Sequence, residues 1–133
     1  MYRIQSIYLL FSVIINIGIA VFSDINQEEI LNVSGLSLFS INLIWLFANT
    51  GATLNFLEIF SYKNRNNQYQ TVRFNNILYS IFIIYVSVIA IFNNFFQLII
   101  PILGLILSLL FCLLALKNIK KDIDLLKSSD RIR

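Results

Sequence analysis

Histidine is absent from this sequence, and cysteine, proline, glycine and charged residues are all scarce. Without histidine the chain lacks the commonest general base and the commonest metal ligand of proteins. Its single cysteine, Cys112, lies within an apolar run and has no second cysteine in the chain with which to form a disulfide. Charged residues make up 13% of the sequence, against about 25% in soluble domains. This composition argues against a soluble globular domain.

Long apolar stretches fill most of the chain instead. Hydrophobic residues make up 58% of the 133 residues, and the mean hydropathy is +0.78. A helix needs about 20 mainly apolar residues to cross a hydrocarbon core of roughly 30 Å. We therefore predict an all-α polytopic membrane protein that forms a single domain over residues 1–133. Its four transmembrane helices are expected at about residues 4–22, 36–60, 76–92 and 98–116, the first uncleaved and the last with Pro101 in its first turn.

Positive charge is confined to segments that would lie on one side of the membrane. Lys and Arg in short loops are retained in the cytoplasm. The charged residues of the first loop are all acidic, and the third loop has no charged residue. We therefore expect a multi-pass protein of the cell inner membrane with both termini in the cytoplasm. The basic residues are Arg3, then Lys63, Arg65 and Arg73 in the middle loop, then Lys117, Lys120, Lys121, Lys127, Arg131 and Arg133 in the tail.

Polar or small residues recur at helical spacing in three of the apolar stretches. Positions seven and eleven apart share one face of a helix, and small residues at every fourth position let membrane helices approach closely. We expect these stripes to face one another in the bundle interior, with hydrogen bonds of about 1 kcal/mol each. The alternative is a polar pathway for a substrate. The stripes are Gln5, Ser12 and Asn16; Asn42, Asn49 and Thr53; and Gly104, Ser108 and Cys112.

One acidic residue, Glu58, falls inside an apolar stretch. Ionisable residues within membrane spans are functional candidates by default. Glu58 lies less than one turn from Phe60, however, with Lys63 and Arg65 just beyond. We therefore expect a surface-seeking or ion-paired Glu58 with a structural role rather than a proton carrier.

The tail from residue 117 to residue 133 contains no glycine or proline, so the fourth helix is expected to extend into a cytoplasmic tail helix. Ile119, Ile123 and Leu126 repeat at the spacing of one apolar helix face. Six basic residues against three acidic ones leave the tail net positive, which favours anionic lipid headgroups by about 1 kcal/mol per nearby Lys or Arg. Membrane anchoring explains this charge, and docking of a protein partner is the alternative.

Motifs of catalysis are missing from the sequence. It has no Cys-x-x-Cys pair, no glycine-rich phosphate loop and no pair of carboxylates placed across a site. We therefore predict that the protein is not an enzyme and uses no metal or cofactor. Expected partners are the bilayer, with anionic lipid on the cytoplasmic side, and a membrane or cytoplasmic protein. A homo-oligomer is compatible with the sequence, and no nucleic acid is expected.

Three segments carry a family resemblance: the opening from Arg3 to Leu10, the central loop from Tyr62 to Asn75, and the ending from Ile119 to Arg133. Over essentially the whole length, the chain resembles the domain of unknown function 4293 family, small four-helix membrane proteins of Bacteroidota. The resemblance implies a bacterial inner-membrane protein with no assigned activity, so it supplies no catalytic residue. All three segments are expected on the cytoplasmic side.

Two functions remain in competition. The first is a non-enzymatic adaptor or assembly factor that presents a basic cytoplasmic surface to a partner. The second is a small transporter or channel component that works as an oligomer, with Asn16, Asn42, Asn49 and Glu58 along a pathway. The candidate interaction surface comprises Arg3, Gln5, Lys63, Arg65, Arg73, Lys120, Lys121, Asp130, Arg131 and Arg133. The candidate intramembrane polar or packing residues are Asn16, Asn42, Asn49, Glu58, Gly104 and Ser108.

Overall fold

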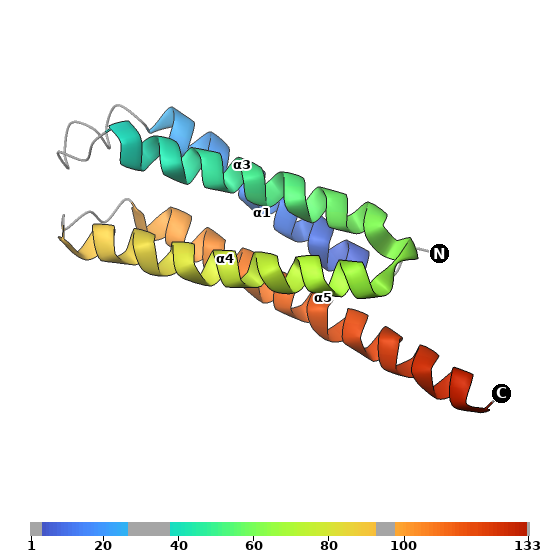
Figure 1. Ribbon diagram of the computed structural model, residues 1–133. Coiled ribbons are helices and arrows are strands. Elements are labelled where there is room, and N and C mark those ends of the chain that lie inside the picture. The colour runs from blue at the N-terminus through green and yellow to red at the C-terminus, as the bar shows by residue number, and fades with distance from the viewer. Residues whose placement is uncertain (1–3, 27–37, 93–97, 133) are drawn as a thin grey trace.

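The computed structural model describes residues 4–26, 38–92 and 98–132, and this part of the chain is helical throughout (Figure 1). Each of its four long helices is long and apolar enough to cross a membrane. The prediction of an all-α chain with four membrane-compatible helices is therefore confirmed. The elements are α1 (Ile4–Ile25), α3 (Leu38–Phe60), the 3-10 turn η1 (Ser61–Lys63), α4 (Arg65–Phe92) and α5 (Ile99–Ile132).

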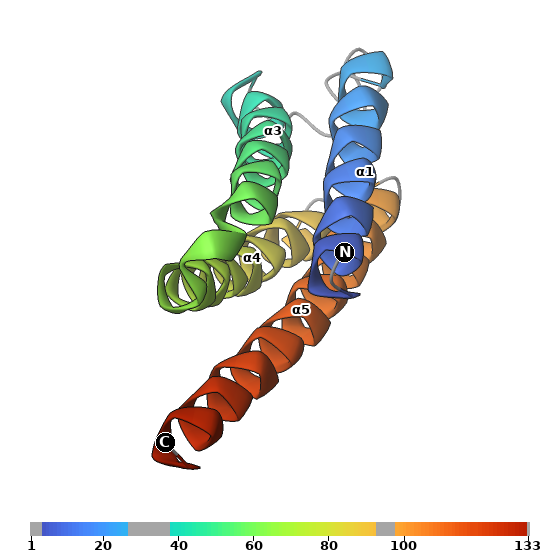
Figure 2. The same ribbon diagram turned by 90° about the vertical axis from the view of Figure 1, so that its right-hand side faces the viewer.

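The helices form a bundle in which α1 packs against both α3 and α5, and α4 packs against α5 (Figures 1 and 2). Stacked aromatic rings join α3 to α4 and α1 to α5. Phe47 of α3 stacks on Phe82 of α4 with ring centroids 3.9 Å apart, and Phe11 of α1 stacks on Phe111 of α5 at 5.5 Å. The start of α1, the η1 turn and the end of α5 all lie at the same end of the bundle (Figure 1).

The apolar side chains of these helices point outward as well as inward. Large Ile, Leu and Phe residues are exposed along all four helices, whereas several buried positions hold polar or small residues. Such an arrangement suits helices surrounded by lipid, because lipid tails solvate apolar side chains and leave small and polar residues for helix contacts. The small buried residues include Ala20, Ala48, Ala52, Cys112 and Ala115.

The predicted middle loop is shorter than expected, because α4 begins at Arg65 rather than near residue 76. Asn64 caps this helix: its carbonyl oxygen accepts a hydrogen bond from the Gln68 amide at 3.0 Å, and its side chain accepts one from the Asn67 amide at 3.4 Å. Gln68 and Val72 of the first turns are fully buried. Hydropathy missed the start of α4 because this stretch is too polar for lipid. A polar stretch can still be helical where the helix extends out of the lipid.

The last helix is much longer than a bilayer is thick. α5 runs without interruption from Ile99 to Ile132, and Pro101 lies in its first turn, as predicted. At 1.5 Å per residue its 34 residues span about 50 Å. Its final turns therefore project beyond the α3–α4 connection (Figure 1).

Candidate functional site

A network of buried polar side chains crosses the middle of the bundle, and all four helices contribute to it. On one side, Ser12 of α1 and Ser108 of α5 bring their hydroxyl oxygens to 2.6 Å, and the Asn16 side-chain amide donates to Ser108 at 3.1 Å. Asn16 also donates to the phenolic oxygen of Tyr79 on α4. These four side chains are fully buried.

Asn55 of α3 forms hydrogen bonds with residues of all three other long helices. Its amide nitrogen donates to Ser12 at 2.8 Å and to the Tyr79 oxygen at 3.0 Å. Its carbonyl oxygen accepts from Asn75 of α4 at 2.7 Å and from the Cys112 thiol of α5 at 3.5 Å. Because one amide bonds to three other helices, Asn55 fixes their relative register.

Helical spacing explains why these residues meet. Ser12 and Asn16, Asn75 and Tyr79, and Ser108 and Cys112 are each four residues apart, so each pair shares a helix face. Opposite them, Gly51 stands four residues before Asn55. A Cβ atom on Gly51 would lie 2.7 Å from the Tyr79 oxygen, so glycine at this position makes room for the tyrosine.

Glu58 extends the network toward the η1 end of the bundle. Its side chain is only 4% exposed. Its carboxyl group interacts with the Asn75 side chain, and the Gln68 side-chain amide donates to its backbone carbonyl at 2.9 Å. The expectation of a surface-seeking or ion-paired Glu58 is therefore wrong: α3 turns this residue inward, and neither Lys63 nor Arg65 forms an ion pair with it.

Several buried polar atoms near this end have no hydrogen-bond partner among the described residues. They are Oε2 of Glu58, Oε1 of Gln68 and Nε2 of Gln5; Oδ1 of Asn16 and both side-chain polar atoms of Asn76 are likewise without a partner. Buried polar atoms in a membrane protein are usually satisfied, so unpaired ones mark a polar interior with spare hydrogen-bonding capacity. No group of three acidic, cysteine or histidine residues suited to a metal occurs in the described ranges.

The predicted stripes hold on α1 and α5. Gln5, Ser12 and Asn16 are buried, as are Ser108 and Cys112. Gly104 packs so closely against α1 that a Cβ atom there would lie 2.9 Å from the Ile19 side chain.

The stripe predicted on the second helix is wrong. Thr53 is exposed, and Asn49 is only partly buried and donates to the Trp45 carbonyl of its own helix at 2.9 Å. The side chain of Asn42 lies outside the described residues. α3 presents Gly51, Asn55 and Glu58 to the interior instead, so a stripe displaced by one to two positions along the helix is the correct one.

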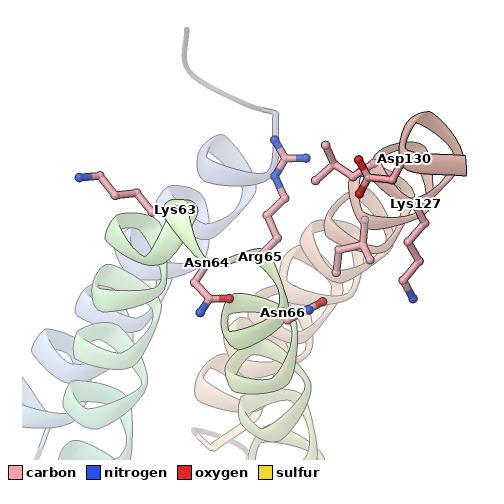
Figure 3. Close-up of a pocket in the computed structure, with 8 residues that line it drawn as sticks. Lys63, Asn64, Arg65, Asn66, Lys127 and Asp130 are labelled. Atoms are coloured by element: carbon pink, nitrogen blue, oxygen red, sulfur yellow. The ribbon is translucent and has the colours of Figure 1, made fainter. Parts of the chain in front are cut away.

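The candidate cytoplasmic surface is brought together only in part. Lys63, Arg65 and Asp130 line one open pocket of about 500 Å³ between the η1 turn and the last turns of α5 (Figure 3). Gln5 is buried in the bundle and does not belong to this surface. Arg73, Lys120, Lys121 and Arg131 are exposed but lie outside the pocket, and Arg3 and Arg133 fall outside the described residues. The full lining is Lys63, Asn64, Arg65, Asn66, Ile123, Leu126, Lys127 and Asp130.

Sequence reasoning did not assign Asn55, Gln68, Asn75 or Tyr79 to the interior. Asn75 and Tyr79 are four residues apart, which could have indicated a shared helix face. The hydropathy boundary near residue 76 instead assigned Asn75 to the loop and Tyr79 to the span. Once α4 is extended to Arg65, Gln68, Asn75 and Tyr79 fall at positions i, i+7 and i+11 of one face, the same spacing that identifies the stripe on α1.

Comparison with known proteins agrees with the resemblance noted in the sequence. No curated protein and no solved structure matches this chain. A family model described as Domain of unknown function (DUF4293) matches residues 1–132. The match covers essentially all of the helical bundle, its buried network and the pocket beside α5, and the chain therefore belongs to this family of unknown function.

Proposed function

We propose that this protein is a non-enzymatic adaptor or assembly factor of a bacterial inner membrane, with both termini in the cytoplasm. The end of the bundle that holds η1 and the last part of α5 carries the basic residues from Lys63 to Arg65 and from Lys117 to Arg131. Positive charge of this kind is retained on the cytoplasmic side. The same end would present its charge to a partner in the cytoplasm.

The projecting end of α5 carries the proposal. Every residue from Asp124 to Arg131 is exposed, including Leu125 at 59% and Leu126 at 47%. Leu125 lies four residues after the exposed Lys121 and outside the pocket, so the two share an outward face. An exposed helix that combines apolar and basic side chains and extends past its own bundle is suited to docking in a groove of another protein.

The test compares charge with side-chain shape. An Arg131→Lys, Arg133→Lys double variant keeps the positive charge but loses the planar guanidinium that grips a carboxylate through two hydrogen bonds. If the tail docks a protein, this variant should weaken copurification of a stoichiometric partner, and truncation after Lys127 should abolish it. In each variant, the loss of complementation of a deletion strain should match the loss of partner copurification.

Arg73→Lys is the control, because Arg73 is an exposed arginine that belongs to α4 rather than to the tail. The truncated protein should keep the thermal stability of the full chain, since residues 128–131 are exposed. Wild-type copurification and complementation by both tail variants would remove the docking role and leave the tail as a membrane anchor.

A second candidate function is a small transporter or channel component. It is favoured by the continuous polar chain from Glu58 through Asn75 and Asn55 to Ser12, Tyr79 and their neighbours. A buried acid connected to polar side chains on every helix is a feature of pathways for protons and ions.

Glu58→Gln separates the two functions. Glutamine has nearly the same shape and keeps a carbonyl oxygen that can accept from Asn75, but it cannot carry charge. If Glu58 is structural, expression and complementation should stay near wild type. Complete loss of function at normal protein level, with Asp124→Asn unaffected as the control, would favour the transporter.

A further inference from the structure

The pocket beside α5 places opposite charges on facing walls. In Figure 3 the Arg65 side chain extends from the start of α4 toward α5, and the Asp130 carboxyl group points back toward it. Arg65 and Asp130 form no ion pair with each other. The amino groups of Lys63 and Lys127 point away from the pocket in the same view. The pocket therefore offers one guanidinium and one carboxylate across an open space.

Two of the other residues that line the pocket are apolar. Ile123 and Leu126 line the pocket on the α5 side. The rim at Lys63 comes three residues after Phe60, whose ring is 60% exposed at the end of the apolar surface of α3. The η1 side of the pocket therefore lies next to the end of this apolar surface, within reach of the headgroups of lipids that surround α3, whichever side of the membrane this end faces.

We propose that this pocket binds the zwitterionic phosphoethanolamine headgroup of a phospholipid. The Arg65 guanidinium binds the phosphate through paired charge-assisted hydrogen bonds, and the Asp130 carboxylate accepts hydrogen bonds from the ammonium group. The glycerol end of the lipid packs on Leu126 and Ile123. A volume of about 500 Å³ is ample for such a headgroup. Lys121 and Leu125 of the proposed docking face do not line the pocket, and lipid retention is measured separately from partner copurification, so failure of one proposal leaves the other testable.

Other headgroups fit this arrangement less well. Phosphocholine has a cation without N–H donors, so it cannot hydrogen-bond to Asp130. Phosphoglycerol has no cation, and its net negative charge would face the Asp130 carboxylate. A site that needs only positive charge would instead favour phosphoglycerol. The order of preference among these three headgroups therefore separates a zwitterion site from a general basic surface.

The experiment measures lipid retention by native mass spectrometry on the detergent-solubilised full chain. The added lipids share the same acyl chains and carry phosphoethanolamine, its N-methyl and N,N-dimethyl derivatives, phosphocholine or phosphoglycerol. Wild-type protein should retain phosphatidylethanolamine about fivefold better than phosphatidylcholine or phosphatidylglycerol, as expected for an interaction of about 1 kcal/mol. Retention should fall as methyl groups replace N–H donors. This series uses only the wild-type protein, so it does not depend on a variant that folds.

Variants of Asp130 and Arg65 test the role of each charged side chain in lipid binding. Asp130→Asn should remove the preference over phosphatidylglycerol and flatten the methylation series. Arg65→Gln should weaken retention of every phospholipid, and Arg65→Lys should weaken it less. Asp124→Asn and Arg73→Gln, which change exposed residues of the same two helices outside the pocket, should behave as wild type.

Equal retention of all headgroups by the wild-type protein would overturn the proposal. So would a preference for phosphatidylglycerol that Asp130→Asn leaves unchanged, because that result describes attraction to positive charge alone. An equal effect of Asp124→Asn and Asp130→Asn would also overturn it, since the pocket would then have no special role.

Discussion

Tyr79 is the side chain around which the interior of the bundle is built. Its phenolic oxygen accepts hydrogen bonds from Asn16 and Asn55, and its ring meets Phe47 edge-on at 5.6 Å. The space for its hydroxyl group exists because Gly51 has no side chain. A tyrosine in this place joins an apolar contact between α3 and α4 to a polar one that reaches α1.

Gly51→Ala should destabilise the protein in detergent by about 1 to 3 kcal/mol, because overpacking of this size forces Tyr79 to move and weakens its hydrogen bonds. The new Cβ atom would lie 2.7 Å from the Tyr79 oxygen and 3.3 Å from the adjacent ring carbon. Gly18→Ala is the matched control, since a Cβ atom there meets nothing within 4 Å. Thermal unfolding of the two variants checks the difference, and equal melting temperatures would contradict it.

At the scale of the element, α5 is one continuous helix with a packed first part and an exposed last part. Its first part packs on α1 and α4 through small and polar residues such as Gly104, Ser108 and Ala115. Its last part extends from the bundle. Ile119 is fully buried, Ile123 still packs partly buried against the core, and every residue from Asp124 to Arg131 is exposed. Membrane helices attract one another through close packing. The stability of the first part of α5 in the bundle therefore depends on the size of its buried residues, whereas the exposed last part tolerates changes of size.

Gly104→Leu should destabilise the folded protein more than Leu107→Ala does. A leucine at position 104 would force α1 and α5 apart at Ile19, whereas Leu107 is 47% exposed and faces lipid. A thermal-aggregation assay in detergent ranks the two variants. An equal or reversed ranking would place the small-residue face of α5 against lipid.

The end of the packed part of α5 can be located in the same way. Ile119→Ala should cost about 2 kcal/mol or more, as for other large-to-small changes at buried sites. Leu125→Ala, on the exposed part, should leave stability nearly unchanged. A similar loss in both variants would show that the last turns of α5 also pack against the bundle.

At the scale of the whole molecule, the protein has an apolar exterior and a polar interior at mid-bundle. Hydrogen bonds between membrane helices contribute only about 0.6 to 1 kcal/mol each, so the network holds the helices in register rather than supplying most of their attraction. Most of the described basic residues lie toward the end of the bundle that holds the start of α1, η1 and the projecting end of α5 (Figure 1).

Topology reporters test the proposed orientation of the bundle in the membrane. Reporters fused after Arg133 or inserted at Asn64 should report the cytoplasm, and reporters inserted within residues 27–34 should report the outside, because the basic residues flank the first two positions. Labelling of intact cells with membrane-impermeant reagents provides a second measurement. Protection of residues 27–34 from outside reagents would overturn the proposed four-span topology.

Sequence by itself determined the number of membrane-compatible helices, because hydropathy over about 20 residues reflects the thickness of a bilayer and needs no tertiary information. It also determined the inward faces of α1 and α5, where polar and small residues repeat without competition from other faces. Tertiary structure decided the rest. α3 carries polar residues on several faces, so only packing against Tyr79 and Ser12 selects Asn55 and Glu58 over Asn49 and Thr53. In the same way, the facing positions of Arg65 and Asp130 follow from the angle at which α5 leaves the bundle (Figure 2), which local sequence does not encode.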